Sequence, residues 1–239
     1  MSIKIEKVEV MGWEHVIRGM RNPMNSWEKS DSRECDGDHC DGCGVDPENP
    51  WLNKHCTDYS ITHHIGPNDH KLMMSLAKGG PVHAKYRRMI TVYLDITAPL
   101  YWWKEFDTYK VGTVANSCST MHKIHEKEFE LGDFSCEYLM NKAQVYNGYV
   151  PTAVLECVVG ALNEFRRLFL ETKDKKYWWQ MIQLLPSSYN QKRTVMLNYE
   201  VLVGIYESRK SHKLDEWREF CKWIETLPYS EIIIGETNV

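Results

Sequence analysis

The stretch MITVYLDITAPLYWWKEF, Met89 to Phe106, decides the fold because a strand pattern in it runs directly into a helix pattern. Its first half alternates apolar and polar side chains, and the apolar positions are Ile90, Val92, Leu94 and Ile96. A period of two with one apolar face is typical of a β-strand that covers a core. Pro99 closes this strand, and the Trp102-Trp103 pair begins an aromatic helix that we expect to be packed.

The segments on either side of this stretch add a first strand and several helices. Residues 1–10 alternate charged residues with Ile and Val, which favours a strand. Apolar spacing and proline or glycine stops predict helices over residues 13–22, 67–78, 150–172, 174–185, 190–210 and 214–228. No internal repeat or linker divides the chain, so we expect one α+β domain over residues 1–239 with a helix-rich C-terminal half.

Composition narrows the class of protein. The chain has 239 residues and a formal net charge of −4, with no basic block, so broad binding of nucleic acid is not expected. No window approaches the ~20 apolar residues that a membrane helix needs. The charged N-terminal stretch does not resemble a signal peptide, and a cytoplasmic protein is therefore expected.

A Cys-rich insertion occupies residues 31–57, which are rich in Asp, Gly, Cys and Pro and have no apolar period. It holds four clustered cysteines, which are Cys35, Cys40, Cys43 and Cys56. The Cys-x-x-Cys pair suits a tight metal-binding turn, so we predict a structural zinc with these four ligands, or with His39 or His55 in place of one. A flexible acidic loop with free cysteines is the alternative, and an iron–sulfur cluster is a minor one.

The remaining cysteines are scattered through the chain. They are Cys118, Cys136, Cys157 and Cys221. Without a secretion signal a disulfide framework is not expected, and these four are interpreted as ordinary reduced residues.

The helix predicted over residues 190–210 contains a pair of polar residues on a mostly apolar stripe. Asn198 and Arg209 are eleven residues apart, which at ~100° per residue places them within about 20° of each other on a helical wheel. A buried arginine needs an anion, and a ligand phosphate would supply one. The alternative is that Arg209 lies at a frayed helix end and pairs with a surface carboxylate.

The order of segments resembles the flavin-dependent thymidylate synthases, the ThyX family. The anchors are VIRGMRNPMNSW, DHKLMMSLAKGGPVH, VYLDITAPLYWWKEF and LLPSSYNQKRTVMLNYEVLVGIYESRKSHKLDEWREFCKWI, in the family's order. The resemblance covers most of the chain apart from the Cys-rich insertion. It implies a mixed β-sheet flanked by helices and a homotetramer. It also implies an enzyme that binds FAD, reduces it with NADPH, and methylates dUMP with methylenetetrahydrofolate as the carbon donor.

The same resemblance assigns site residues position by position. The arginine-rich signature of the family falls on Thr108, Tyr109, Lys110 and Thr113, of which the first three are expected at the cofactor. Further expected cofactor contacts are Asn198 and His212. Expected substrate contacts are Glu105, Ser117, Ser119 and Arg209, and Arg209 also falls on the family's catalytic-site arginine.

This chain departs from the family in the charge of that site. The signature arginines are replaced, and the family's second helix arginine falls on Glu200, which reverses its charge. Lysine replaces an arginine only as a point charge, and threonine does not replace it. Nearby basic residues that would restore positive charge are His83, Lys85, Arg87 and Arg88, and a basic surface patch is the alternative interpretation of these four.

Three hypotheses for function follow. The first is a divergent ThyX-like enzyme acting on a pyrimidine deoxynucleotide. The second is a non-catalytic nucleotide-binding or partner-binding protein of the same fold, and the third is a zinc-stapled interaction module whose insertion carries the function.

Overall fold

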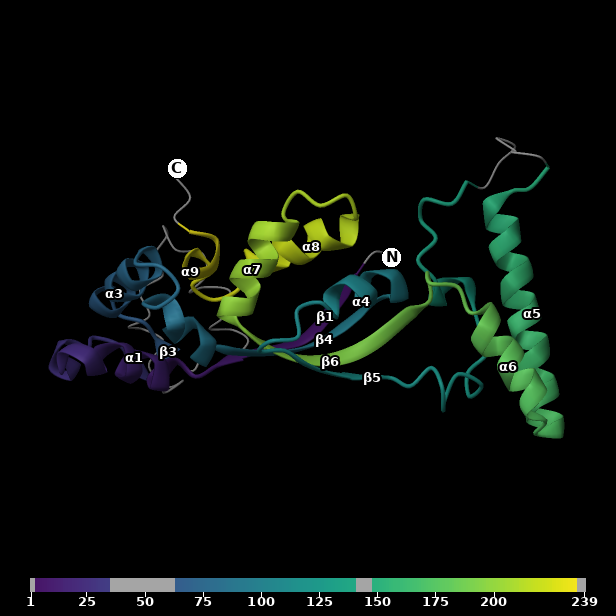
Figure 1. Cartoon of the computed structure of the whole chain (residues 1–239), viewed down its shortest axis with the longest axis horizontal. Helices are drawn as coiled ribbons and strands as arrows, with labels where there is room; N and C mark the ends of the chain where they lie inside the picture. Colours follow the sequence, from purple (N-terminus) through teal and green to yellow (C-terminus); the bar gives the residue numbers. More distant parts are fainter. Residues whose placement is uncertain (1–2, 35–62, 141–147, 236–239) are drawn as a thin grey trace, which may run out of the picture. The chain divides into compact units, whose positions relative to one another are not determined.

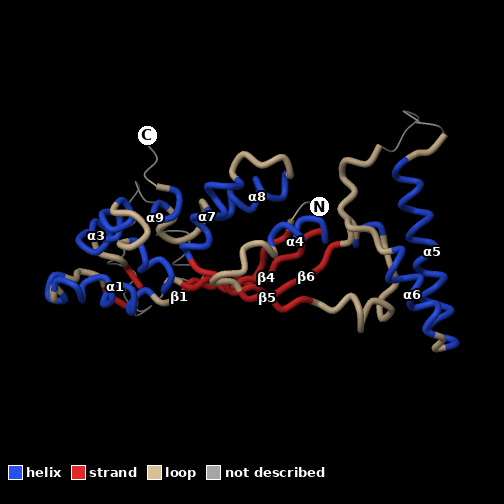
Figure 2. Tube along the Cα trace, in the orientation of Figure 1, coloured by secondary structure: helices blue, strands red, loops and turns tan. Residues whose placement is uncertain are grey.

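The computed structural model describes residues 3–34, 63–140 and 148–235. Four strands form one sheet in the order β1-β4-β6-β5, and β2 and β3 form a separate two-stranded ribbon (Figures 1 and 2). The strands are β1 (Lys4–Met11), β2 (Arg33–Glu34), β3 (His63–His64), β4 (Thr91–Pro99), β5 (Val114–Ser117) and β6 (Asn190–Asn198). The α-helices are α1 (Trp13–Arg21), α3 (Pro67–Lys78), α4 (Leu100–Phe106), α5 (Pro151–Thr172), α6 (Lys175–Leu184), α7 (Tyr199–Arg209), α8 (Asp215–Ile224) and α9 (Glu231–Ile234). The short 3₁₀ helices are η1 (Asn22–Met24), η2 (Trp27–Lys29), η4 (Ala84–Met89) and η5 (Leu131–Asp133).

The strand-to-helix stretch folds as its pattern predicts. In β4 the side chains of Val92, Leu94 and Ile96 are buried, whereas Tyr93 is exposed. The alternation is broken by Asp95, which is also buried and accepts a hydrogen bond from the Thr194 hydroxyl at 2.7 Å. A buried carboxylate needs such partners.

Helix α4 then buries its aromatic face. The Trp102 and Trp103 rings are 4.9 Å apart, and Phe106 stacks on Trp102 at 5.0 Å. The indole N–H of Trp103 donates to the backbone carbonyl of Gln191 at 2.9 Å, which ties α4 to the start of β6. The predicted aromatic helix is therefore confirmed.

The chain divides into two compact units, and each unit includes part of every strand of the four-stranded sheet. The first unit comprises residues 1–6, 95–108 and 115–194. One cluster of its buried side chains lies between α5, α6 and the segment before α5, and these two helices lie side by side (Figure 1). The buried members are Ile124, Phe129, Phe134, Leu155, Leu162 and Met181.

The second unit comprises residues 7–94, 109–114 and 195–239. Here α7 packs against η4, α8 and α9, while α1 and α3 pack on η4. Tyr199, the first residue of α7, is fully buried; its backbone N–H donates to Ile90 and its hydroxyl donates to the Pro228 carbonyl. These bonds fix the start of α7 beside the end of η4.

The sequence prediction for residues 190–210 is wrong. Residues 190–210 were expected to form one helix, but residues 190–198 form strand β6 and the helix begins at Tyr199. Val195 and Leu197 are buried on one face of the strand, so their period is two. Asn198 is consequently not on a helical stripe with Arg209 but is the N-cap of α7.

Candidate anion site at the end of helix α7

Three residues that the sequence assigned to the site lie together in the second unit. Arg209 is the last residue of α7, and its Nε donates a hydrogen bond to the Tyr109 hydroxyl at 2.8 Å. The guanidinium also lies over the Trp217 ring, 4.7 Å from its centroid. Stacking on the Trp217 ring and the hydrogen bond to Tyr109 orient the guanidinium.

His212 completes this cluster with an unusual hydrogen-bonding arrangement. Its Nδ1 lies 3.2 Å from the backbone nitrogen of Leu214, while its Nε2 lies 3.0 Å from a terminal nitrogen of Arg209. A neutral imidazole has one N–H and one acceptor nitrogen, and a guanidinium only donates. The tautomer decides which of the two contacts is a hydrogen bond: a proton on Nδ1 leaves Nε2 to accept from the Arg209 guanidinium, and a proton on Nε2 leaves Nδ1 to accept from Leu214.

The loop that carries Tyr109 is held along α7 by a close approach at Gly112. Asn198 uses its side-chain oxygen to cap α7 by accepting the N–H of Val201 at 3.1 Å. A Cβ placed on Gly112 would lie 2.8 Å from the Asn198 amide nitrogen and 3.2 Å from a Val201 methyl group. The loop therefore lies against the start of α7 at Gly112 and against its end at Tyr109.

Replacing Gly112 with alanine is expected to destabilise this loop. Gly112 has φ +79, which costs a residue with a Cβ about 1–2 kcal/mol, and the added methyl group meets Asn198 as well. The midpoint of urea unfolding should fall accordingly. Gly204→Ala in α7 is the matched control, because a Cβ there meets nothing within 4 Å and alanine favours a helix. Equal midpoints for the two variants would contradict the close approach at Gly112.

The reversed charge at Glu200 has a partner from η4. A terminal nitrogen of Arg87 lies 3.9 Å from the Glu200 carboxylate, and the two side chains are 12% and 26% exposed. The other three basic residues near η4 are exposed, which are His83, Lys85 and Arg88. Arg87 thus offsets the charge that Glu200 introduces, because a carboxylate with little exposure is stabilised by a nearby cation.

The remaining assigned residues lie in other parts of the described chain. Lys110 is exposed next to Tyr109 in the loop. Glu105, Thr108, Ser117 and Ser119 belong to the first unit, and their roles at a substrate or cofactor stay predictions. Two of these make local bonds: the Thr108 hydroxyl donates to the Glu105 carbonyl at 2.7 Å, and the Ser119 hydroxyl oxygen accepts the N–H of His122 at 3.0 Å.

Sequence reasoning missed Trp217 as a member of the cluster. The residue is fully buried in the first half of α8, and its ring contacts both Tyr109 and His212. Its place five residues after His212 is the signal available in the sequence, because a short turn followed by a helix returns that ring to the end of α7.

The predicted zinc site is not among the described residues, and the described residues bear on other metal sites, the scattered cysteines and membrane helices as follows. The four predicted zinc ligands, Cys35, Cys40, Cys43 and Cys56, lie outside the described residues. Over residues 3–34, 63–140 and 148–235, no group of three His, Cys, Asp or Glu side chains could hold a metal ion. Cys118, Cys136, Cys157 and Cys221 are free thiols. Among the helices that the structure describes, none has the length and apolar character to cross a membrane.

The fold is shared with enzymes of known structure. The flavin-dependent thymidylate synthase ThyX from Helicobacter pylori, complexed with FAD and dUMP, matches with a TM-score of 0.60 and 17% identity, over 99% of this chain and 98% of that chain. A second structure of that enzyme with FAD and dUMP gives the same values.

A further match is the UMP/dUMP methylase PolB from Streptomyces cacaoi bound with 5-Br UMP. It has a TM-score of 0.51 and 12% identity, over 72% of this chain and 84% of that chain. The sequence matches no protein-family model, and no curated protein matches it. The chain therefore has the ThyX fold, and the expected α+β fold class is confirmed.

Proposed function

We propose that the chain is a nucleotide-methylating enzyme that acts on a pyrimidine nucleotide of the dUMP type. Two facts support this. The fold extends over almost the whole length of a thymidylate synthase whose structure contains dUMP, and a second enzyme of similar fold was solved with 5-Br UMP. The second fact is the cluster at the end of α7, where Tyr109 and Trp217 hold the Arg209 guanidinium.

Arg209 in this cluster is the observation that carries the proposal. A nucleotide phosphate offers oxygens that accept charge-assisted hydrogen bonds, and a guanidinium is suited to donate them. Tyr109 and Trp217 hold the guanidinium so that little conformational freedom is lost when the phosphate binds. Lys110, exposed in the same loop, adds a second positive charge. Binding the phosphate is the role we assign to Arg209, and orienting its guanidinium is the role we assign to Tyr109 and Trp217.

FAD, NADPH and methylenetetrahydrofolate are part of the same proposal, and a bound reduced flavin would supply hydride to the nucleotide. The described residues fit this cofactor only in part. Asn198 uses its oxygen to cap α7, and the Thr108 hydroxyl is bonded to a backbone carbonyl. Two of the five expected flavin contacts are thus committed to their own backbone. Lys110 and His212 are the side chains that would lie against the cofactor. We also propose a homotetramer, by analogy with the fold.

The test measures binding and chemistry on the same protein. dUMP and UMP should bind, and deoxyuridine, which lacks the phosphate, should bind at least about 30-fold more weakly, because a charge-assisted contact is lost. Incubation with FAD, NADPH, methylenetetrahydrofolate and dUMP should give a nucleotide that has gained one methyl group, read by mass spectrometry. Equal affinity for nucleotide and nucleoside would contradict the phosphate site. Binding without methylation would contradict the enzyme and leave the nucleotide-binding alternative.

A further inference from the structure

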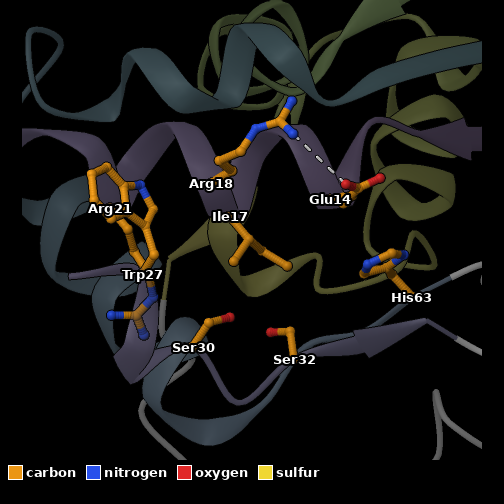
Figure 3. Close-up of a pocket in the computed structure, with 8 residues that line it drawn as sticks. All are labelled: Glu14, Ile17, Arg18, Arg21, Trp27, Ser30, Ser32 and His63. Carbon is orange, nitrogen blue, oxygen red and sulfur yellow. Dashed lines mark ion pairs between the residues drawn. The ribbon is translucent and has the colours of Figure 1, made fainter. Parts of the chain in front are cut away.

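A separate cavity of about 260 Å³ lies beside α1 in the second unit. Figure 3 shows Ile17 at its centre, with Trp27 and His63 on opposite sides and Arg18 and Glu14 above. None of these residues belongs to the cluster around Arg209. The cavity therefore offers a second place where a ligand would contact the protein.

The polar side chains below the cavity already have hydrogen-bond partners. Arg21 is 4% exposed and donates from Nε to Asp69 at 2.6 Å. The hydroxyl groups of Ser30 and Ser32 both donate to the other oxygen of the same carboxylate, at 2.7 and 2.6 Å. These polar groups support the cavity, and a ligand has no need to neutralise Arg21 because Asp69 already does so.

The interior of the cavity is suited to a flat ring. Ile17 is 6% exposed and forms an apolar floor, whereas Trp27 is half exposed at the side. The indole N–H of Trp27 donates to the Asn22 side chain at 2.8 Å, which fixes the plane of the ring. The volume is below the ~300–1,000 Å³ that is usual for drug-sized ligands, so one aromatic ring with a short substituent is the expected size.

The rim carries one charge of each sign. Glu14 and Arg18 lie one turn apart on α1, and their side chains are 64% and 60% exposed. Their closest charged atoms are 3.9 Å apart, which is the length of a weak surface ion pair. Both groups therefore keep capacity for a ligand that brings its own anion and cation.

We propose that this cavity binds a zwitterionic aromatic α-amino acid. The ring lies on Ile17 beside Trp27, the α-carboxylate accepts from the Arg18 guanidinium, and the ammonium donates to the Glu14 carboxylate. An α-amino acid carries its ammonium and its carboxylate on the same carbon atom. This arrangement matches the two opposite charges that lie side by side on the rim. The proposal is independent of the nucleotide site.

Three compounds with the same phenyl ring test the contacts of the carboxylate and of the ammonium separately. L-Phenylalanine, 3-phenylpropionate and phenethylamine are titrated into the full chain at pH 7 by ligand-observed NMR and calorimetry. Phenylalanine should bind with a Kd of roughly 0.1–1 mM, as expected for a ligand of this size. Each probe with a single charge should bind about tenfold more weakly, since one charged contact is lost. L-Leucine should also bind more weakly, because it lacks the ring.

Variants with matched controls tie the binding to this cavity. Arg18→Gln and Glu14→Gln should each weaken phenylalanine binding about tenfold, and Trp27→Leu should weaken it by a similar factor. The controls are Arg88→Gln and Trp179→Leu, which change an exposed arginine and a comparably exposed tryptophan elsewhere. They should leave the affinity unchanged. Absence of saturable phenylalanine binding would overturn the proposal, as would equal affinity for the three probes or equal effects of variants and controls.

Discussion

Asp69→Asn is expected to lower the free energy of unfolding by about 3–5 kcal/mol, because it breaks a buried ion pair and leaves one charge without its counter-charge. Asp69 has no exposed surface, and Arg21, its partner at 2.6 Å, is 4% exposed. Its Oδ2 accepts from the hydroxyl groups of Ser30 and Ser32 and from the backbone N–H groups of Asp31 and Ser32. An asparagine would place an NH₂ group against donors on one side or the other.

Urea unfolding of the original chain and of the Asp69→Asn variant measures this loss of stability. Asp174→Asn is the control, because Asp174 caps α6 with its side chain 44% exposed and asparagine caps helices equally well. That variant should stay within about 0.5 kcal/mol of the starting protein. A loss of the same small size for Asp69→Asn would show that the buried pair contributes little.

The same carboxylate predicts a pH dependence with a defined sign. Burial raises the pKa of Asp69, but hydrogen bonds from Ser32, Ser30 and Arg21 outweigh it and hold the pKa below its ordinary value of 3.8. A group with a lowered folded-state pKa stabilises the protein above its unfolded pKa and loses that effect as the pH falls through the folded value. The difference in stability between the original chain and Asp69→Asn should therefore be constant above about pH 5 and shrink below 3.8.

Arg209→Gln is expected to weaken binding of dUMP by about 30- to 150-fold, or 2–3 kcal/mol, while leaving deoxyuridine binding unchanged. The reason is that the phosphate loses its charged donor, whereas the sugar and base keep their contacts. Arg209→Lys should restore only part of the affinity, because lysine is a point charge without the planar edge that bonds to Tyr109.

Calorimetric titration of each variant measures these affinities. Lys210→Gln is the matched control: it removes one positive charge from the adjacent residue, which is exposed and has its ammonium over the Tyr206 ring. This control should change the affinity less than about threefold. If Lys210→Gln and Arg209→Gln weaken binding equally, the effect is one of net charge and the proposed phosphate contact is wrong.

The sequence predicted the strand and helix of Thr91 to Phe106 because their apolar periods are unambiguous. It failed over residues 190–198 because two periods overlap there. Val195, Tyr199 and Leu202 fit a helix, while Val195 and Leu197 fit a strand, and the apolar period alone does not decide between them. Asn198 before an apolar helix was a usable N-cap signal that would have placed the boundary correctly.

Only part of the candidate site was predicted from the sequence. Tyr109, Arg209 and His212 were assigned from their order in a family resemblance, and the structure brings these three together. The contact with Trp217 and the pairing of Arg87 with Glu200 depend on how α8 and η4 return to α7. Spacing along the chain does not encode such returns, because they follow from packing between distant elements.

The ribbon β2–β3 makes the chain modular at one point. Arg33 pairs with His64 and Glu34 with His63, so the chain leaves and re-enters the second unit at neighbouring positions. Two antiparallel neighbours can be joined by a turn of two residues. The segment between Glu34 and His63 can therefore be exchanged for a short turn, because the two strands already lie side by side. Joining Glu34 to His63 through an Asn-Gly turn would remove it altogether while keeping the Ser30 and Ser32 contacts to Asp69.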